Sequence, residues 1–188
     1  MKKTFSVLLM VLLASMLIVS CDNKADEPVS RVGEKGEAGI IFYDKGSYSD
    51  GWRYLEADTA DLSGSFKYGE KNTDYNAKGD SIGDGKTNTD KLVANQGSNG
   101  SYAAVACSNL ERTVGEKKYD DWFLPSSGEF VEMVKVKDKL NLDGQYWTST
   151  EKNDEQGGVY GSENTNGTGA YSYAKDSTNY KVRAVRAF

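Results

Sequence analysis

The chain of 188 residues contains no histidine, only two cysteines and only two prolines. Without histidine, Ser-His-Asp and Cys-His nucleophilic systems and histidine-based zinc sites are excluded. The sequence also lacks a basic cluster, and its formal net charge is −5. An acidic chain of this kind is a poor candidate for nucleic-acid binding.

The N-terminus has the order of features found in exported bacterial proteins. Two lysines precede an apolar run, residues 5–19, which is too short for a membrane-spanning helix. Small Ser20 then precedes Cys21, so the run Ile-Val-Ser-Cys resembles the lipobox of bacterial lipoproteins. The resemblance implies that residues 1–20 are a signal peptide and that Cys21 is lipidated, which would anchor the protein to a membrane. The alternative is an ordinary secretory peptide whose Cys21 pairs with Cys107.

Removal of residues 1–20 would leave a tether followed by one domain. The removed segment contains two lysines and no acidic residue, so the formal net charge falls from −5 to −7. Lipidation of Cys21 leaves Cys107 without a partner, so packing rather than a disulfide would stabilise the fold. Cys107 lies on the apolar stripe of a predicted helix, and we expect an inert core cysteine.

Residues 21–38 are expected to form the lipidated cysteine and a flexible tether, because most of them are polar or charged and show no apolar period. Gly33, Gly36 and Gly39 recur at every third position, but so few triplets cannot sustain a collagen helix. We interpret them as a linker that ends in a strand-entry glycine. The folded domain is expected to span residues 39–188.

Hydrophobic patterns predict a domain of short strands, short helices and long loops. Strands are predicted by the following runs: 40–43, 52–57, 121–124, 145–150 and 182–188. Helices are predicted near 87–97, with N-caps among residues 87–90, near 101–110, and from Ser126, where Glu129 completes a capping box. Residues 58–87 are loop-rich, and the Asn, Gly, Ser, Thr and Tyr content of residues 151–179 favours hairpins and surface loops.

Six runs occur in the order found in one family of bacterial secreted domains. The runs are Gly39–Tyr43, Gly51–Ala57, Ile82–Thr89, Asp121–Ser126, Tyr146–Glu151 and Val182–Arg186. Over residues 39–188 the chain thereby resembles the family named after the C-terminal domain of the Lcl collagen-like adhesin. The resemblance implies an α+β fold similar to C-type lectins and to the formylglycine-generating enzyme, with short antiparallel strands, two or three short helices and long loops. The chain lacks a collagen repeat array, so collagen-like assembly is not implied.

Catalytic chemistry has little support in the sequence. A formylglycine-generating activity like that of the related enzymes would need a cysteine pair at a copper site, and lipidation would leave Cys107 alone. A hydrolytic carboxylate pair would have to come from Glu129, Glu132, Glu151 and Asp154, whose separations linear sequence cannot give. We expect these acids to be solvated surface residues.

Calcium is the one cofactor that we weigh against the expectation of no cofactor. The following residues supply oxygen ligands in a glycine-punctuated segment: Asp74, Asn76, Asp80, Asp84, Asn88 and Asp90. The segment departs from a calcium loop at two positions. Ile82 stands between Asp80 and Asp84 where the pattern needs a middle Asp or Asn ligand, and Lys91 stands where a bidentate acid belongs. We expect no metal or other cofactor, and we assign these side chains to Asx-turns and helix caps.

Aromatic residues divide into two groups. Trp52, Trp122 and Trp147 lie in strand-like runs and are expected in the core. The tyrosines of the C-terminal region alternate with Asn, Ser and Gly, a mixture typical of binding loops. The candidate ligand-binding residues are Tyr160, Asn164, Asn166, Tyr171 and Tyr173. The alternative is a tyrosine-rich hairpin with one face against the core.

The sequence therefore predicts a lipoprotein of the bacterial cell envelope, with the outer membrane or cell surface favoured over the inner membrane. Its partners would be the membrane, through the lipid anchor, and an unknown protein or glycan, bound without catalysis. One alternative is an envelope enzyme that uses carboxylates or a metal. Another is a structural envelope component without a small ligand.

Overall fold

The structure, a computed structural model, describes residues 30–98, 101–161 and 169–188 and confirms an α+β fold. Its helices are α1 (Asp84–Gln96), α2 (Ala103–Ser108), α3 (Ser127–Lys135) and α4 (Lys137–Leu140). Its strands are β1 (Ile40–Ser49), β2 (Trp52–Ala57), β3 (Arg112–Val114), β4 (Lys117–Tyr119), β5 (Gln145–Glu151), β6 (Gln156–Gly161), β7 (Ala170–Ala174) and β8 (Val185–Ala187). The predicted signal peptide, residues 1–20, Cys21 and residues 22–29 of the predicted tether lie outside the described residues. No helix within these ranges is long and apolar enough to cross a membrane.

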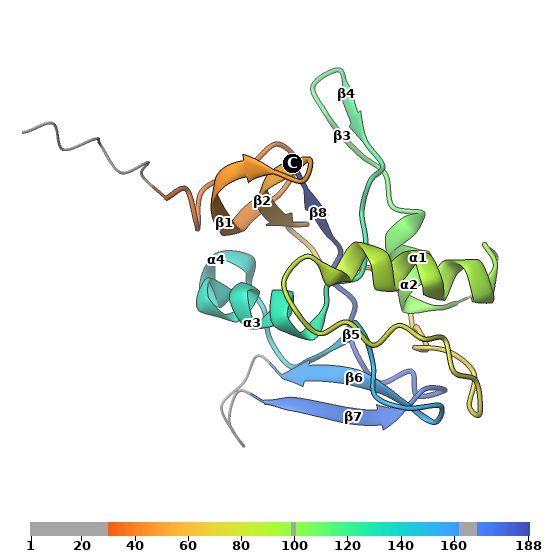
Figure 1. Ribbon diagram of the computed structural model, residues 1–188. Helices are drawn as coiled ribbons and strands as arrows, with labels where there is room; N and C mark the ends of the chain where they lie inside the picture. The colour runs from red at the N-terminus through yellow and green to blue at the C-terminus, as the bar shows by residue number, and fades with distance from the viewer. Residues whose placement is uncertain (1–29, 99–100, 162–168) are drawn as a thin grey trace, which may run out of the picture.

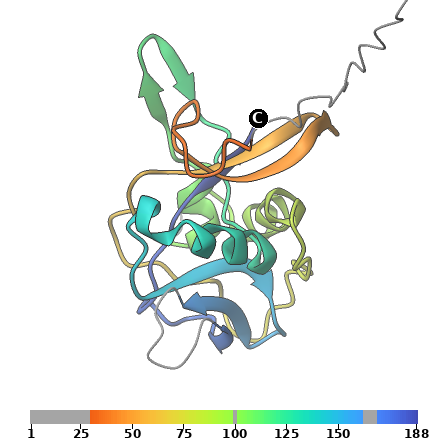
Figure 2. The ribbon, with the colours of Figure 1, turned by 90° about the vertical axis from the view of Figure 1, so that its left-hand side faces the viewer.

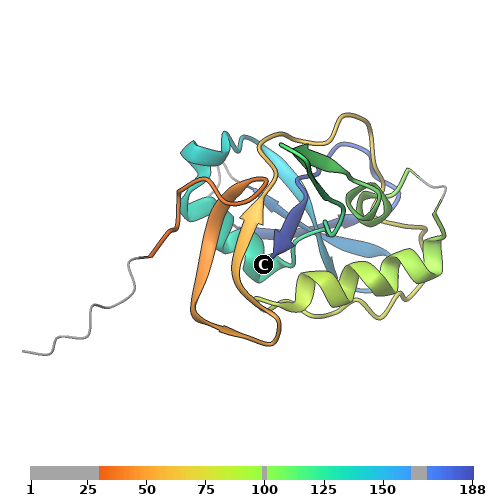
Figure 3. The same ribbon diagram turned by 90° about the horizontal axis from the view of Figure 1, so that it is seen from above.

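The strands form three antiparallel sheets, ordered β1-β2-β8, β3-β4 and β5-β6-β7. Figures 1 and 2 show α1 and α3 between the first and third sheets, and α3 contacts β1 on one side and β5 and β6 on the other. The β3–β4 hairpin projects away from the body of the domain in both views. Seen from above in Figure 3, α1 runs along one side of the domain.

Three short segments, which we call the central wall, separate two hydrophobic cores. They are residues 122–124, 146–147 and 182–185. In each segment, some side chains pack in one core and their neighbours pack in the other. Trp122 and Leu124 pack in one core while Phe123 packs in the other. Phe123 and Val185 exchange both backbone hydrogen bonds, at 2.8 and 2.9 Å. Residues 122–124 are thus buried and Phe123 forms a β-bridge with Val185, in keeping with the predicted strand-like element, whereas Asp121 is exposed.

The β1–β2 hairpin is longer than the predicted first strand. Its turn residues Asp50 and Gly51 have φ values of 51° and 86°, which match the two left-handed positions of a type I′ turn. Because this turn follows the twist of the strands, β1 continues to Ser49, six residues beyond the predicted end at Tyr43. The second strand, Trp52–Ala57, has the predicted bounds.

The segment before β1 is folded against the domain, although the sequence assigns residues 21–38 to a flexible tether. The Gly33 N–H donates to the Ile41 carbonyl at 2.8 Å, and the Gly39 N–H donates to Glu56 Oε2 at 3.1 Å. A Cβ on Gly36 would lie 2.0 Å from Glu56 Oε2, and one on Gly39 would lie 2.1 Å from the Ala57 carbonyl oxygen. The glycine spacing therefore permits close approach to β2, and the folded region begins before residue 39.

Helix α3 begins at the predicted capping box. The Glu129 N–H donates to Ser126 Oγ at 3.2 Å, and the Ser126 N–H donates to Glu129 Oε2 at 2.8 Å. Two apolar residues of the helix, Phe130 and Met133, are fully buried. The hydrogen bonds of the cap and the apolar face together explain why this sequence forms a helix here.

Helix α1 begins at Asp84, three residues before the predicted N-caps at residues 87–90. Its N-cap is Gly83, with φ of 96°, and the N–H groups of Gly83 and Gly85 donate to Glu129 Oε1 at 3.0 and 3.4 Å. One carboxylate therefore caps both α1 and α3. The prediction was wrong because the capping side chain lies 44 residues beyond Gly85 in sequence.

The remaining differences are short. α2 starts at Ala103 rather than residue 101, because Tyr102 forms a parallel bridge with Lys67. β8 covers only residues 185–187 of the predicted strand 182–188, although Val182 and Ala184 are fully buried. The β3–β4 hairpin and the four-residue α4 were not predicted.

Candidate functional site

Three tyrosines predicted to bind ligand lie on the β6–β7 hairpin, and each is half-buried. The Tyr160 ring lies 5.5 Å from the Phe130 ring, and the Tyr173 ring lies 4.8 Å from that of Tyr180, measured between centroids. Tyr160 and Tyr173 thus hold the hairpin against the core, whereas Tyr171 also borders a groove. The two predicted asparagines lie outside the described residues: Asn164 and Asn166.

This groove, the Tyr171 groove, has a volume of about 230 Å³. It lies where the β6–β7 hairpin meets the end of β5, the start of α3 and the loop before α1. Its polar lining residues are Asp80, Ser127, Thr150, Lys152, Tyr171 and Ser172. It thus combines aromatic surface with several hydroxyl groups, which suits a ligand that both donates and accepts hydrogen bonds.

Internal hydrogen bonds fix the floor of the Tyr171 groove. The Thr150 hydroxyl accepts from the Ser127 N–H at 3.0 Å and donates to the Gly79 carbonyl at 2.9 Å. The Thr148 hydroxyl donates to the Gly158 carbonyl at 3.1 Å, and a Cβ on Gly158 would lie 2.7 Å from the Thr150 carbonyl oxygen. The floor therefore stays in one geometry before any ligand arrives, which lowers the entropic cost of binding.

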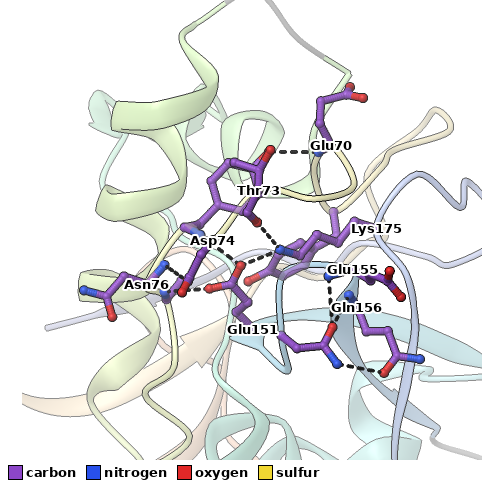
Figure 4. Close-up of polar contacts among 12 residues, drawn as sticks. Glu70, Thr73, Asp74, Asn76, Glu151, Glu155, Gln156 and Lys175 are labelled. Carbon is purple, nitrogen blue, oxygen red and sulfur yellow. Dashed lines mark hydrogen bonds and ion pairs between the residues drawn. The ribbon is translucent and has the colours of Figure 1, made fainter.

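A buried ion pair involves Glu151, which lies in sequence between the groove residues Thr150 and Lys152. Figure 4 shows the Lys175 ammonium against the Glu151 carboxylate and the Thr73 carbonyl, with both Nζ–O distances at 2.5 Å. The Glu151 carboxylate also accepts from the N–H groups of Tyr75 and Ala77, at 2.9 and 3.3 Å. Both charged side chains are fully buried. Because Glu151 ends β5 and Lys175 follows β7, the pair ties the two ends of the sheet to the loop at residues 73–77.

Two of the acids expected at the surface are buried. Glu151 belongs to the ion pair with Lys175, and Glu129 caps α1 and α3. Burial raises the pKa of Glu129 to about 7, while the N–H donors of Ser126, Gly83 and Gly85 act in the opposite direction. The expectation was wrong because most donors to these two carboxylates come from segments distant in sequence. Both therefore have structural partners.

Most of the oxygen-bearing side chains of the calcium alternative are engaged with protein groups. Asp74 accepts from Lys78 Nζ at 2.9 Å, which together with the Asn76 N–H lowers the pKa of Asp74 to about 2. Asp84 accepts from the Ser81 N–H at 2.9 Å. The other contacts are Asn88 with Gly79 and Asp90 with Lys86. Within the described residues no group of three or more Cys, Asp or Glu side chains is arranged to hold a metal ion.

The core predictions hold for most of the aromatic and sulfur side chains. Trp122 and Trp147 are buried, and Cys107 is fully buried with its thiol pKa raised by that burial. Trp52 departs from the prediction because it is half-buried and lines a second cavity. The alternation in the β2 sequence placed Trp52 on one face of a strand but could not show that this face borders open space.

Most of the groove was beyond sequence reasoning. The tyrosine-rich composition pointed to Tyr171, but Asp80 and Ser127 come from segments far upstream of it. Ser127 reaches the groove because it is the first residue of α3. Asp80 is placed beside it because the Gly128 N–H donates to the Asp80 carbonyl at 2.7 Å. The only sequence signal for Ser127 was its place after the capping residue, which marks a helix start and not a ligand site.

A comparison with models of known protein families finds no match to the chain. A comparison with curated proteins likewise finds no significant match.

Proposed function

We propose that this protein is a bacterial envelope lipoprotein whose domain binds a protein or glycan ligand without catalysis. The order of lysines, apolar run, small residue and Cys21 supports the lipid anchor and an outer-membrane or surface location. The six runs that resemble the Lcl C-terminal domain family support a lectin-like domain. The α+β fold agrees with that assignment without identifying the family.

The observation that carries the binding function is the Tyr171 groove. Its floor is fixed by the Thr148 and Thr150 hydroxyls, and its wall contains a half-buried aromatic ring. Antibody binding loops use the same combination of aromatic area and adaptable hydrogen-bonding groups. Glu129 and Glu151, two of the four acids considered for a hydrolytic pair, have structural partners, which favours binding over hydrolysis.

Replacing Tyr171 with alanine should weaken binding of the ligand about tenfold, since an aromatic anchor would be lost from the groove. The full chain, purified from bacterial membranes in a sugar-free detergent, would first be screened on arrays of glycans, envelope components and matrix proteins. Tyr48→Ala is the matched control, because Tyr48 is 72% exposed on the distant β1–β2 hairpin. An array without any bound component, or a bound component indifferent to Tyr171→Ala, would contradict the proposed function.

Replacing Cys21 with serine should move the protein from the membrane fraction to the soluble fraction, because the acyl chains that anchor it can no longer be attached. Cell fractionation followed by immunoblotting measures the distribution. Cys107→Ser is the matched control, since Cys107 is fully buried and should not affect anchoring. Membrane retention of the Cys21→Ser protein would show that the anchor lies elsewhere.

A further inference from the structure

A second cavity, the Trp52 cavity, lies where β2 and β8 meet the start of α1. Its volume is about 280 Å³. Leu55 and Phe123 are buried residues that contribute to its apolar lining, together with half-buried Trp52 and Ala187. A volume just below the usual range of small-molecule pockets limits the ligand to one or two small rings.

The aromatic wall of this cavity is fixed in place. The Trp52 ring packs against Tyr43, with 6.2 Å between centroids, and the Lys45 Nζ lies 3.9 Å from the Trp52 ring centroid. Lys45 is held in turn by a hydrogen bond of 2.6 Å to the Ser49 carbonyl. Trp52 therefore presents a rigid apolar surface at little entropic cost.

Three charged groups at the rim of the cavity already have partners of opposite sign. Asp121 accepts two hydrogen bonds from Arg186, at 2.6 and 3.0 Å. The Lys86 ammonium bonds both carboxylate oxygens of Asp90, at 2.6 and 2.8 Å. The third lining charge at the rim, Asp50, lies 3.6 Å from Lys45 Nζ. The fourth ionisable lining residue, fully buried Glu129, accepts hydrogen bonds from the backbone N–H groups of Ser126, Gly83 and Gly85.

The paired charges determine which ligand charge fits. At the rim, a cationic or anionic ligand would have to compete with one of these ion pairs, whereas a neutral ligand would not. The Glu129 oxygens, deeper in the wall, are already occupied by three backbone N–H donors. The carboxylates of Asp50 and Asp121 keep lone pairs that can accept from ligand hydroxyl groups, and Lys86 can donate. The preferred ligand is therefore neutral, rich in hydroxyl groups, and apolar on one face.

We propose that the Trp52 cavity binds a neutral hexopyranose unit. The C–H face of the sugar ring would contact Trp52, and its hydroxyl groups would meet Asp50, Lys86 and Asp121 at the rim. This site is separate from the Tyr171 groove, and it does not depend on the function proposed for that groove.

The test is a ligand-observed NMR titration of the full chain in a sugar-free detergent. The neutral probes are the methyl pyranosides of glucose, galactose and mannose, and the charged probes are the methyl glycosides of glucuronic acid and glucosamine. At least one neutral probe should bind saturably with a Kd of about 1 mM. The charged probes should bind at least about tenfold more weakly, since they disturb the ion pairs.

Two variants assign binding to the cavity. Trp52→Ala removes the aromatic wall, and Ala187→Leu fills the cavity without removing a core side chain, so the second variant remains informative if the first fails to fold. Each should raise the Kd at least about tenfold, while Val114→Ala, at an exposed position of the β3–β4 hairpin, should leave it unchanged. No saturable binding of a neutral probe, tighter binding of a charged probe, or a Kd indifferent to Ala187→Leu would each overturn the proposal.

Discussion

Replacing Lys175 with methionine should lower the free energy of unfolding by about 3–5 kcal/mol, the usual cost of breaking a buried ion pair from one side. The Glu151 carboxylate would remain fully buried without its cation. The N–H groups of Tyr75 and Ala77 would still donate to it, but two neutral donors cannot replace an ammonium at 2.5 Å. Urea unfolding followed by tryptophan fluorescence measures the loss.

Two further variants separate the ion pair from other effects of the Lys175 substitution. The double variant Lys175→Met with Glu151→Gln should be more stable than Lys175→Met alone, because no uncompensated charge remains buried. Lys78→Met is the surface control, since Lys78 and Asp74 are each about half exposed, and it should cost far less stability than Lys175→Met. A Lys175→Met protein as stable as the Lys78→Met protein would show that the buried pair contributes little.

The stability of the domain should fall as the pH rises from about 5 to about 7, and Glu129 should account for the fall. Burial raises the pKa of Glu129 from its ordinary value of 4.5 to about 7. Between these two values the folded protein binds a proton that the unfolded chain releases, so raising the pH favours unfolding. The full difference corresponds to about 3 kcal/mol, complete once the pH exceeds the folded pKa.

The histidine-free sequence makes this pH dependence unusually easy to measure, because no imidazole titrates in the same range. Urea unfolding at pH 5, 6, 7 and 8 should show the decline in the parent protein and a flatter profile in Glu129→Gln. Glu132→Gln on the same helix is the control, since Glu132 pairs with Lys135 instead of capping a helix. Constant or rising parent stability across this range would show that the Glu129 carboxyl stays ionised in the folded state.

Local signals in the sequence predicted the elements that local interactions determine. The capping box at Ser126 and Glu129 involves residues three apart, so the start of α3 could be predicted. The start of α1 could not, because its cap is the same Glu129 side chain, which comes from a distant segment. Alternation predicted β2 correctly, whereas the length of β1 depended on the turn at Asp50 and Gly51.

The candidate sites follow the same division. Composition pointed to Tyr171, and the apolar pattern identified Trp122 and Trp147 as core residues. The hydroxyl network beneath the groove links residues 79, 127 and 150, and its existence depends on how the β5–β6–β7 sheet packs against α3. The buried charges were missed because single acidic and basic residues in sequence carry no sign of their eventual partner.

The central wall has a consequence for how the domain unfolds. Trp122 and Leu124 belong to one hydrophobic core and Phe123 to the other, so neither core is closed without the same short segment. Melting one core would release this segment and expose the apolar side of the other. The two cores therefore depend on each other for folding. Although the described strands fall into three separate sheets, we expect the domain to unfold as one cooperative unit.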